Sequence, residues 1–499
     1  MKLLINLKPV LNIYSKIFLV ILLFKVSLPS QSPQSFTQFI NSLNSINSSD
    51  RIIKIDSFIT NQKIKGFPII ESTSVYFIYR GNVSVNIGVT GDHTIWNLPT
   101  TFLQRVLDTD LYFIKKEFEL DARIDYKFVK DGSWILDPLN QNTIMGGFGP
   151  NSELAMPNYI QPKEIIYNPT IPKGVTTSHT ISSSYLNNSR TIKTYIRTAP
   201  NPNYEYPVIY VQDGNDYINL GSMTTIVDNL FNDKNIEPLI CVFIPPIDRS
   251  NEYRQTKILQ YSNFITKEVI PFIDSNYKTI KSASRRAIFG SSDGGHISLF
   301  LGINYPNYFG FAAGQSSTIS NRLIDSVKSK NSNSTLIYMD CGTYDINNSS
   351  YNFLELNRNF NSLLKSKNYN VKYFEYHEGH SWGNWRAHID DVLKFFQVVT
   401  KSKKDNNILP SHGSIEVLPN YPNPFNPSTN ITFVLADKKF VTITISDLLG
   451  RNLKTISADY YNQGKHTIKF KADEIKSGNY FYTLKTEDNS ITRKLTILK

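Results

Sequence analysis

Cysteine is scarce in this chain: only Cys241 and Cys341 occur among its 499 residues. Two cysteines cannot form the disulfide framework that holds small secreted domains together. A single bond between them and a pair of buried free thiols both remain open at this point. The chain also lacks the clustered His, Cys and Glu spacing of a zinc site, so we expect no metal ion and no cofactor.

Dense basic stretches are also missing. The formal net charge of +11 comes mostly from scattered lysines, and aromatic residues make up 13% of the chain. Without a basic stripe interleaved with aromatic residues, we expect no nucleic-acid partner. The aromatic content is sufficient for packed cores, and the length predicts more than one domain.

An apolar run of eight residues lies near the N-terminus. Residues 17–24 are apolar, lysines precede them, and Ser27, Ser30 and Ser32 follow. This order is typical of a signal peptide, which we assign to residues 1–32. The alternative is a membrane anchor, but the run is short for spanning a bilayer. We therefore expect no stable transmembrane segment after cleavage.

The rest of the chain changes its pattern twice. Residues 33–160 contain short alternating runs separated by Gly, Asp and Asn, which predict a β-sandwich. A proline-rich linker over residues 161–174 follows. After a polar linker over residues 401–412, residues 413–499 again show an all-β pattern and predict a small β-sandwich.

The central segment, residues 175–400, alternates strand and helix patterns. Residues 206–211 and 239–244 are continuous apolar runs, as expected for parallel strands that are covered on both faces. This alternation predicts a doubly wound, mostly parallel α/β sheet. The expected fold class is therefore multidomain, with a central α/β domain flanked by two β-sandwiches.

The most informative motif is Gly290-Ser291-Ser292-Asp293-Gly294, a G-x-S-x-G pattern. An apolar strand pattern precedes it, and an amphipathic helix pattern follows it. In that context the serine lies on a sharp turn with its hydroxyl pointing away from the sheet. Ser292 is therefore the candidate nucleophile.

A serine nucleophile needs a base, and histidine is the natural one because its pKa lies near neutrality. Of the eight histidines, His380 is favoured because Gly379-His380-Ser381-Trp382 follows the last predicted strand. His377 is the alternative. The base needs a carboxylate to orient it. Asp345, in the loop after the strand at residues 336–340, is favoured over Asp340.

The oxyanion formed on attack needs two backbone N–H donors. We expect one from Asp293 and the other from Gly214 or Asn215, in the loop after an early strand. Four side chains are possible substrate contacts on loop position alone: Tyr217, Arg249, Tyr253 and Trp382.

With these motifs in order, residues 175–400 resemble the esterase family that includes enterochelin esterases, feruloyl esterases and other carbohydrate esterases. The matching segments are 210–214, 243–249, 268–274, 290–295, 341–345 and 379–382. The resemblance implies an α/β-hydrolase domain with Ser292, Asp345 and His380 as nucleophile, acid and base. Asp213-Gly214-Asn215 departs from the His-Gly pair of many relatives.

The two flanking segments carry resemblances of their own. Residues 65–155 resemble an early-set, immunoglobulin-like, glycogen-binding-like domain, through Gly91-Asp92-His93-Thr94-Ile95-Trp96 and through Trp134. We expect core packing for Trp96 and Trp134, with sugar stacking as the alternative. Residues 413–499 resemble the C-terminal sorting domain of the type IX secretion system, through residues 418–427, 447–451 and 477–482. A fibronectin-like accessory domain is the alternative there.

These features together predict a serine esterase that is exported through the periplasm and is secreted or held at the cell surface. The expected partners are a small-molecule or carbohydrate-linked ester and the type IX secretion machinery. Feruloyl or acetyl carbohydrate esters are the expected substrates. The alternatives are a catechol siderophore (enterochelin) ester, with amide cleavage as a more distant choice, and a non-catalytic carbohydrate-binding protein on a hydrolase scaffold.

Overall fold

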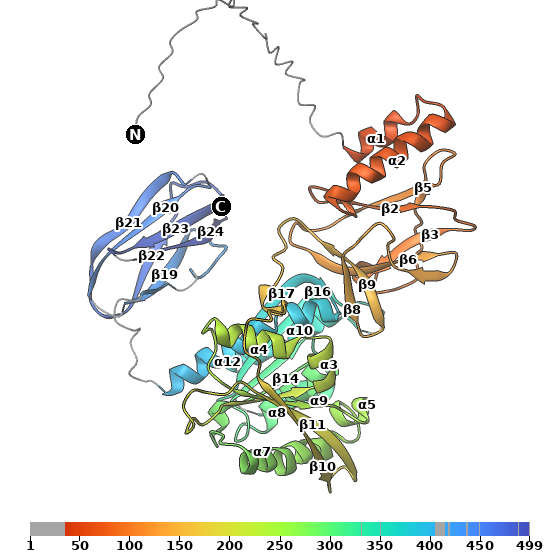
Figure 1. Ribbon diagram of the computed structural model, residues 1–499. Helices are drawn as coiled ribbons and strands as arrows, with labels where there is room; N and C mark the ends of the chain where they lie inside the picture. The colour runs from red at the N-terminus through yellow and green to blue at the C-terminus, as the bar shows by residue number, and fades with distance from the viewer. Residues whose placement is uncertain are drawn as a thin grey trace, which may run out of the picture.

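The structure is a computed structural model, and it describes residues 35–330, 332–349, 351–404, 415–417, 420–435, 438–448, 450–487 and 489–498. The predicted signal peptide and most of the predicted linker 401–412 lie outside these residues. In the described part, the chain forms five sheets in three successive parts (Figure 1). The protein is therefore a multidomain one.

Two helices open the described chain, α1 (Phe36–Ser42) and α2 (Ser48–Lys65). The prediction of strands throughout residues 33–160 is wrong for this stretch. Ser35 and Gln38 form a capping box at the start of α1, and the Asn47 side chain caps α2. The apolar residues recur at helical spacing and are buried together against the first sheet: Phe36, Phe39, Ile55 and Ile59.

Two antiparallel sheets follow and share one core. The first has the order β1 (Ile69–Glu71), β2 (Ser74–Arg80), β5 (Leu111–Glu117) and β4 (Gln104–Arg105). The second has the order β3 (Ile87–Gly91), β6 (Arg123–Lys130), β9 (Gly149–Ala155) and β8 (Thr143–Gly146), and β7 (Ser133–Ile135) pairs with β6. Phe77 of the first sheet and Tyr126 and Phe128 of the second are buried in the same cluster. These two sheets, with the segments that connect their strands (residues 69–155), are called the sandwich below.

The central part is built on an eight-stranded sheet. Its order is β10 (Val175–Ser183), β11 (Asn188–Ile196), β13 (Ile240–Ile244), β12 (Val208–Gln212), β14 (Arg286–Ser291), β15 (Phe311–Gln315), β16 (Leu336–Tyr344) and β17 (Asn370–Gly379). The pairs from β13 to β17 are parallel, and β10 and β11 are antiparallel additions at one edge. The strand order reverses beside β12, where β13 and β14 flank it, and sheets of this kind bind ligands at such a point.

Helices cover both faces of the central sheet. One face packs against a π-helical segment η3 (Phe264–Val269), α7 (Ile270–Asn276), α8 (Asp293–Asn304), α9 (Asn321–Lys328) and α10 (Phe353–Ser366). The other packs against α4 (Met223–Asn232), α11 (Trp382–Ala387) and α12 (Ile389–Lys404). Short helices lie in the loops: α3 (Gly214–Asn219), α5 (Arg249–Tyr253) and α6 (Ile258–Asn263). Burial on both faces explains the continuous apolar runs of β12 and β13.

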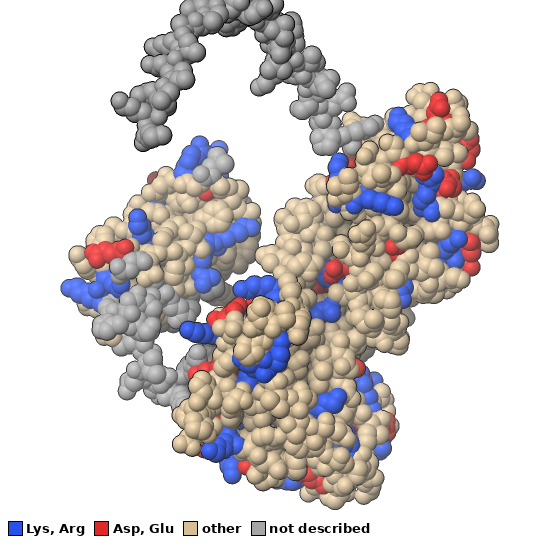
Figure 2. Space-filling view, viewed as in Figure 1, with Lys and Arg blue, Asp and Glu red and all other residues tan. Residues whose placement is uncertain are grey.

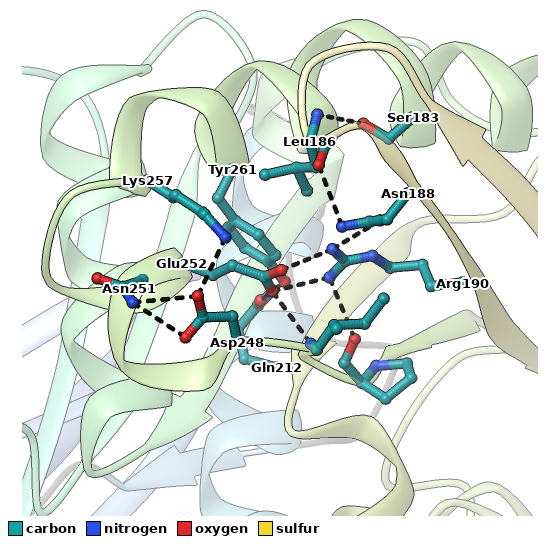
Figure 3. A network of polar contacts seen from close by, with 12 residues as sticks. Ser183, Leu186, Asn188, Arg190, Gln212, Asp248, Asn251, Glu252, Lys257 and Tyr261 are labelled. Carbon is teal, nitrogen blue, oxygen red and sulfur yellow. Dashed lines mark hydrogen bonds and ion pairs between the residues drawn. The ribbon is translucent and has the colours of Figure 1, made fainter.

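A buried ion pair joins β11, the second strand of the central sheet, to helix α5 (Figure 3). The Arg190 guanidinium forms two contacts, of 2.7 and 2.8 Å, with the Glu252 carboxylate, and both side chains are 1% exposed. The guanidinium also lies over the Phe264 ring, 4.7 Å from its centre. The pair is thus out of water, and each charge depends on the other.

Replacing Glu252 with alanine is expected to lower the free energy of unfolding by about 3–5 kcal/mol, because Arg190 keeps its charge without a partner. Urea unfolding of the full chain measures this loss. The double variant Arg190→Met with Glu252→Leu is the control, and it is expected to recover most of the stability. A double variant no more stable than Glu252→Ala would contradict this account.

The C-terminal part contains two antiparallel sheets with a common core. One has the order β18 (Ile415–Val417), β19 (Ser428–Leu435) and β22 (Gly464–Lys471). The other has the order β21 (Asn452–Tyr461), β20 (Lys439–Ser446), β23 (Gly478–Lys485) and β24 (Ser490–Ile497). Phe433 of the first sheet and Ile443 and Tyr482 of the second are fully buried together.

Candidate active site

Ser292 lies between β14, which ends at Ser291, and α8, which begins at Asp293. Its backbone has φ 55° and ψ −120°, which a non-glycine residue adopts only when its surroundings impose it. Those surroundings include three backbone hydrogen bonds: the Ser292 amide donates to Gln315 O at 2.9 Å, and Ser292 O accepts from the Thr318 and His296 amides, each at 3.0 Å. The strand–turn–helix geometry therefore holds the Ser292 hydroxyl at the carboxyl edge of the sheet.

The structure brings the three predicted side chains together at that edge. His380 follows β17, and its Nε2 lies 3.1 Å from Ser292 Oγ. Asp345 follows β16, and its Oδ1 lies 2.7 Å from His380 Nδ1. With Nδ1 protonated, His380 donates a hydrogen bond to Asp345 and accepts one from the Ser292 hydroxyl. The edges of Phe353 and Trp385 pack against the imidazole, with ring centres 4.8 and 4.9 Å away.

Asp345 is buried, yet its surroundings favour the charged carboxylate. Burial alone would raise its pKa, but the charge of His380 and the hydrogen bonds from His380 and from the Ile346 amide hold the pKa below its ordinary value. The Cys341 thiol also donates to Oδ2, at 3.5 Å. A carboxylate kept charged beside the imidazole is what a histidine base requires.

The two alternative residues lie elsewhere. His377 Nδ1 is 2.7 Å from Asp121 of the sandwich. Asp340 accepts a hydrogen bond from Gln315 Nε2 at 3.2 Å, and burial raises its pKa to about 7. Of the two candidate acids, it is Asp345 that His380 contacts.

The predicted oxyanion donors lie in the first turns of two helices. Asp293 begins α8, and Gly214 and Asn215 begin α3. Amides in the first turn of a helix have no partner inside it. A Cβ atom on Gly214 would lie 2.4 Å from the amide nitrogen of Ile244 in β13, so close packing of α3 on β13 requires this glycine.

A cavity of about 870 Å³ opens from Ser292 and His380, and both the central part and the sandwich line it. From the central part, its walls include Asp213, Asp216, Arg249, Ile346, Trp382 and Trp385. From the sandwich, they include Ile95, Trp96, Asp125, Lys127, Trp134, Gly147, Phe148 and Asn151. Figure 1 shows β8 and β9 reaching down to the central part beside β16 and β17.

Two of the four predicted substrate contacts are wrong. Tyr217 and Tyr253 are fully buried and do not line the cavity. Tyr217 donates to Gln315 Oε1 at 3.2 Å, and the Tyr253 hydroxyl accepts from the Asp213 amide at 3.0 Å. The position of a residue in a loop does not determine the direction of its side chain. Here the Tyr217 and Tyr253 rings are buried under the loops and support them. Arg249 and Trp382 do line the cavity, and Arg249 forms a fork with Asp213 at 2.7 and 2.8 Å.

The expectation of core packing for Trp96 and Trp134 is also wrong. The two rings stack with centres 6.2 Å apart, both line the cavity, and Trp134 is 44% exposed. Ile95 and Trp96 have φ of 55° and 57°, a strained arrangement that turns them toward the cavity. Phe148, which was not predicted from the sequence, also lines the cavity and is fully exposed at the tip of the β8–β9 hairpin. An aromatic residue between Gly147 and Gly149 was the available signal.

Among the described residues, no three His, Cys, Asp or Glu side chains cluster in a way that would hold a metal ion. None of the helices there combines the length and apolar character needed to span a membrane. Cys241 and Cys341 are both free and buried. Lys and Arg lie scattered over the face drawn in Figure 2, in small groups between Asp and Glu.

Comparison with known proteins gives two family matches and related chains. Residues 183–396 match the family described as "Putative esterase", and residues 420–498 match "Secretion system C-terminal sorting domain". YjcH of Bacillus subtilis, an uncharacterized protein, is 32% identical over 223 residues, which is 42% of this chain and 93% of that protein. YbbA of the same organism, also uncharacterized, is 29% identical over 119 residues, 21% of this chain and 47% of that protein.

Solved structures extend the likeness at the level of fold. A ferric enterobactin esterase from Salmonella typhimurium is 19% identical with a TM-score of 0.56, covering 66% of this chain and 94% of that one. An enterobactin esterase from Shigella flexneri is 20% identical with a TM-score of 0.54, covering 65% and 92%. On these matches the chain belongs to the putative esterase family and is a carboxylic ester hydrolase that carries a secretion-system sorting domain.

Proposed function

We propose that this protein hydrolyses carboxylic esters through an acyl-enzyme formed on Ser292. His380 takes the hydroxyl proton of Ser292 as the oxygen attacks the ester carbonyl, and it passes that proton to the leaving alcohol. Asp345 holds the imidazole in the required tautomer and stabilises the imidazolium. In the second step His380 deprotonates water, which attacks the acyl carbon, releases the acid and restores Ser292.

In this mechanism the negative charge on the carbonyl oxygen is held by backbone amides. We assign one donor to Asp293, at the start of α8, and the other to Gly214 or Asn215, at the start of α3. Both helices direct their positive ends toward the carboxyl edge of the sheet, where such charge is stabilised. No metal ion or cofactor takes part in these steps.

The observation that carries the proposal is the hydrogen-bond chain from Ser292 through His380 to Asp345, at 3.1 and 2.7 Å, opening on the cavity. Separations within hydrogen-bond reach are what proton transfer between nucleophile and base requires. A structural histidine would not need to lie between a strained serine and a buried carboxylate at the mouth of a cavity.

For the substrate, we propose a feruloyl or acetyl ester of a carbohydrate. A cavity of about 870 Å³ is larger than an acetyl group needs, and it has the size of sites that enclose drug-sized ligands. The flat faces of Trp96, Trp134 and Phe148 suit an aromatic acid or a sugar ring. Export through the periplasm by the type IX machinery, to a secreted or cell-surface location, would bring the protein to extracellular polysaccharide.

A catechol siderophore ester is the second candidate. The enterobactin esterases share a fold with this chain over 92–94% of their own length. The aromatic walls of the cavity suit catechol rings as well. In either case we assign residues 175–400 as an α/β-hydrolase domain, residues 33–160 as an early-set domain with two preceding helices, and residues 413–499 as the type IX sorting domain.

A panel of esters tests this proposal. The full chain, without its leader, is assayed with p-nitrophenyl acetate, methyl ferulate, a feruloylated arabino-oligosaccharide, an acetylated xylo-oligosaccharide and enterobactin. We expect an initial burst of p-nitrophenol, a transient mass increase on Ser292, and the highest kcat/KM with a carbohydrate ester. A preference for enterobactin would favour the second candidate. Failure to hydrolyse any of the five would overturn the esterase mechanism and favour a binding protein on a hydrolase scaffold.

A further inference from the structure

The sandwich contacts the backbone on both sides of His380, the proposed base, in addition to lining the cavity. We propose that Asp92 and Arg123 of the sandwich are positioning residues, which hold the loop that carries His380 in its working geometry. The inference rests on the proposed function, since it concerns the same His380. It assigns to the sandwich a part in proton transfer, in addition to its part in the cavity wall.

The sandwich packs closely against this loop at two glycines. His380 follows Gly379, the last residue of β17, and Gly383 lies in the first turn of α11. A Cβ atom on Gly379 would lie 2.1 Å from Asp92 Cγ, and one on Gly383 would lie 1.8 Å from Arg123 Nη1. The two side chains therefore pack directly on the main chain, and no side chain fits between them and the loop.

Asp92 and Arg123 are themselves firmly held within the sandwich. Asp92 accepts hydrogen bonds from the Asp125 amide at 2.8 Å and from Trp96 Nε1 at 3.0 Å. Arg123 forms ion pairs with Asp125 at 2.6 Å and with Glu153 at 2.7 Å, and its side chain is 1% exposed. Arg123 and Asp125 are buried, and two ion pairs together with the two hydrogen bonds to Asp92 fix the side chains on which the loop rests.

The sandwich also contacts the neighbourhood of the proposed acid. Glu119, in the turn between β5 and β6, accepts a hydrogen bond from Tyr344, the residue before Asp345. In the same turn, Asp121 pairs with His377 at 2.7 Å, three residues before His380. The Phe118 ring packs edge-on against Tyr344, with centres 5.9 Å apart. The turn between β5 and β6 thus contacts the ends of both β16 and β17, the strands that lead to Asp345 and His380.

Ser292 is held differently. Its amide and carbonyl bond to Gln315 and Thr318 of the central part, as described above. Disturbing the sandwich contact should therefore misplace the base and leave the nucleophile where it is. A shift of about 1 Å in a catalytic group can lower the rate about 100-fold. The expected signature is a loss in kcat, with KM little changed, on a substrate too small to reach the sandwich wall.

The experiment uses p-nitrophenyl acetate and the full chain without its leader. In the first variant, Arg123→Met, we expect kcat to fall about 10- to 100-fold and KM to stay within about twofold. Arg123→Lys is expected to recover part of the loss. Arg80→Met is the matched control, because Arg80 pairs with Asp56 and Asp110 in the N-terminal part, and Arg80 is not among the residues that contact the His380 loop. The control is expected to keep kcat within about twofold.

A second variant, Gly383→Ala, distinguishes displacement of the loop from loss of folding. Gly383→Ala leaves the ionic network intact but forces a methyl group against the guanidinium, so it should move the loop and lower kcat in the same way. The low-field proton resonance of the His380–Asp345 hydrogen bond is expected to weaken or disappear in Arg123→Met and Gly383→Ala, and to persist in Arg80→Met. Each variant is assayed below its own unfolding temperature, measured by circular dichroism.

The outcomes separate this inference from the proposed function. A folded Arg123→Met or Gly383→Ala protein with the kcat and the resonance of the Arg80→Met control would overturn the positioning role. So would losses of kcat that follow the unfolding temperature alone across all the variants. If Ser292→Ala keeps the activity of the unmodified protein, the proposed mechanism itself fails, whatever the Arg123 variants do.

Discussion

Alanine at position 292 is expected to lower kcat by about 10⁶-fold, the loss typical of removing the nucleophile from a triad that acts as a unit. His380 and Asp345 keep their 2.7 Å contact in this variant, but they have no hydroxyl to activate. A residual rate above that of water is expected, because the backbone donors remain. Stopped assays with p-nitrophenyl acetate and with the preferred ester of the panel measure the loss.

The control for this prediction is Ser362→Ala, which removes the hydroxyl of an exposed serine on α10. It is expected to keep kcat and KM unchanged. Circular dichroism and the unfolding temperature of the Ser292 variant should match those of the parent protein, since alanine keeps the Cβ atom and the backbone hydrogen bonds of the turn. Retention of more than about 1% of the activity by Ser292→Ala would contradict the assignment of the nucleophile.

Asparagine at position 345 is expected to lower kcat by about 10⁴-fold. The shape of the side chain is preserved, but the amide can donate to His380 Nδ1 and so favours the tautomer that has its proton on Nε2. In that tautomer Nε2 cannot accept the proton of Ser292, which lies 3.1 Å away. Steady-state assays with p-nitrophenyl acetate, compared with the unmodified protein, measure the effect.

Asp340→Asn is the matched control for this second prediction. Both carboxylates are buried, Asp340 within β16 and Asp345 directly after it, but Asp340 contacts Gln315, whereas Asp345 contacts His380. The Asp340 variant is expected to keep kcat within about tenfold, with its effect mainly on stability. If instead Asp340→Asn loses more activity than Asp345→Asn, the acid has been assigned to the wrong residue.

The cavity links these catalytic predictions to specificity. Ser292 and His380 line it, and the sandwich, a separate part of the chain, contributes another part of its lining. Trp96, Trp134 and Phe148 contribute aromatic faces, while Arg249 and Lys127 contribute positive charge. Changes on the sandwich wall are therefore expected to alter the choice of ester. In contrast, changes at residues 92 and 123 should alter the rate even for the smallest ester.

Local pattern was enough to predict much of the central part. The apolar runs of β12 and β13 follow from burial on both faces, and the turn at Ser292 follows from a glycine motif between strand and helix. His380 and Asp345 could be selected because carboxyl ends of parallel strands share one edge of a sheet. Helices α1 and α2 were missed, although Ser35 and Gln38 carry a local capping signal.

The chemistry available at the carboxyl edge of the sheet can be read from the sequence, because residue types and the succession of strands follow along the chain. Which side chains face that edge depends on the packing of segments that are distant in sequence. Tyr217 and Tyr253 were turned inward, while Trp96 and Phe148 came to line the cavity from a part of the chain more than 100 residues away in sequence from Ser292. The contact of Arg123 with Gly383 spans still more of the chain. Such contacts depend on how the two cores pack against each other, and the helix and strand propensities of individual residues do not predict that packing.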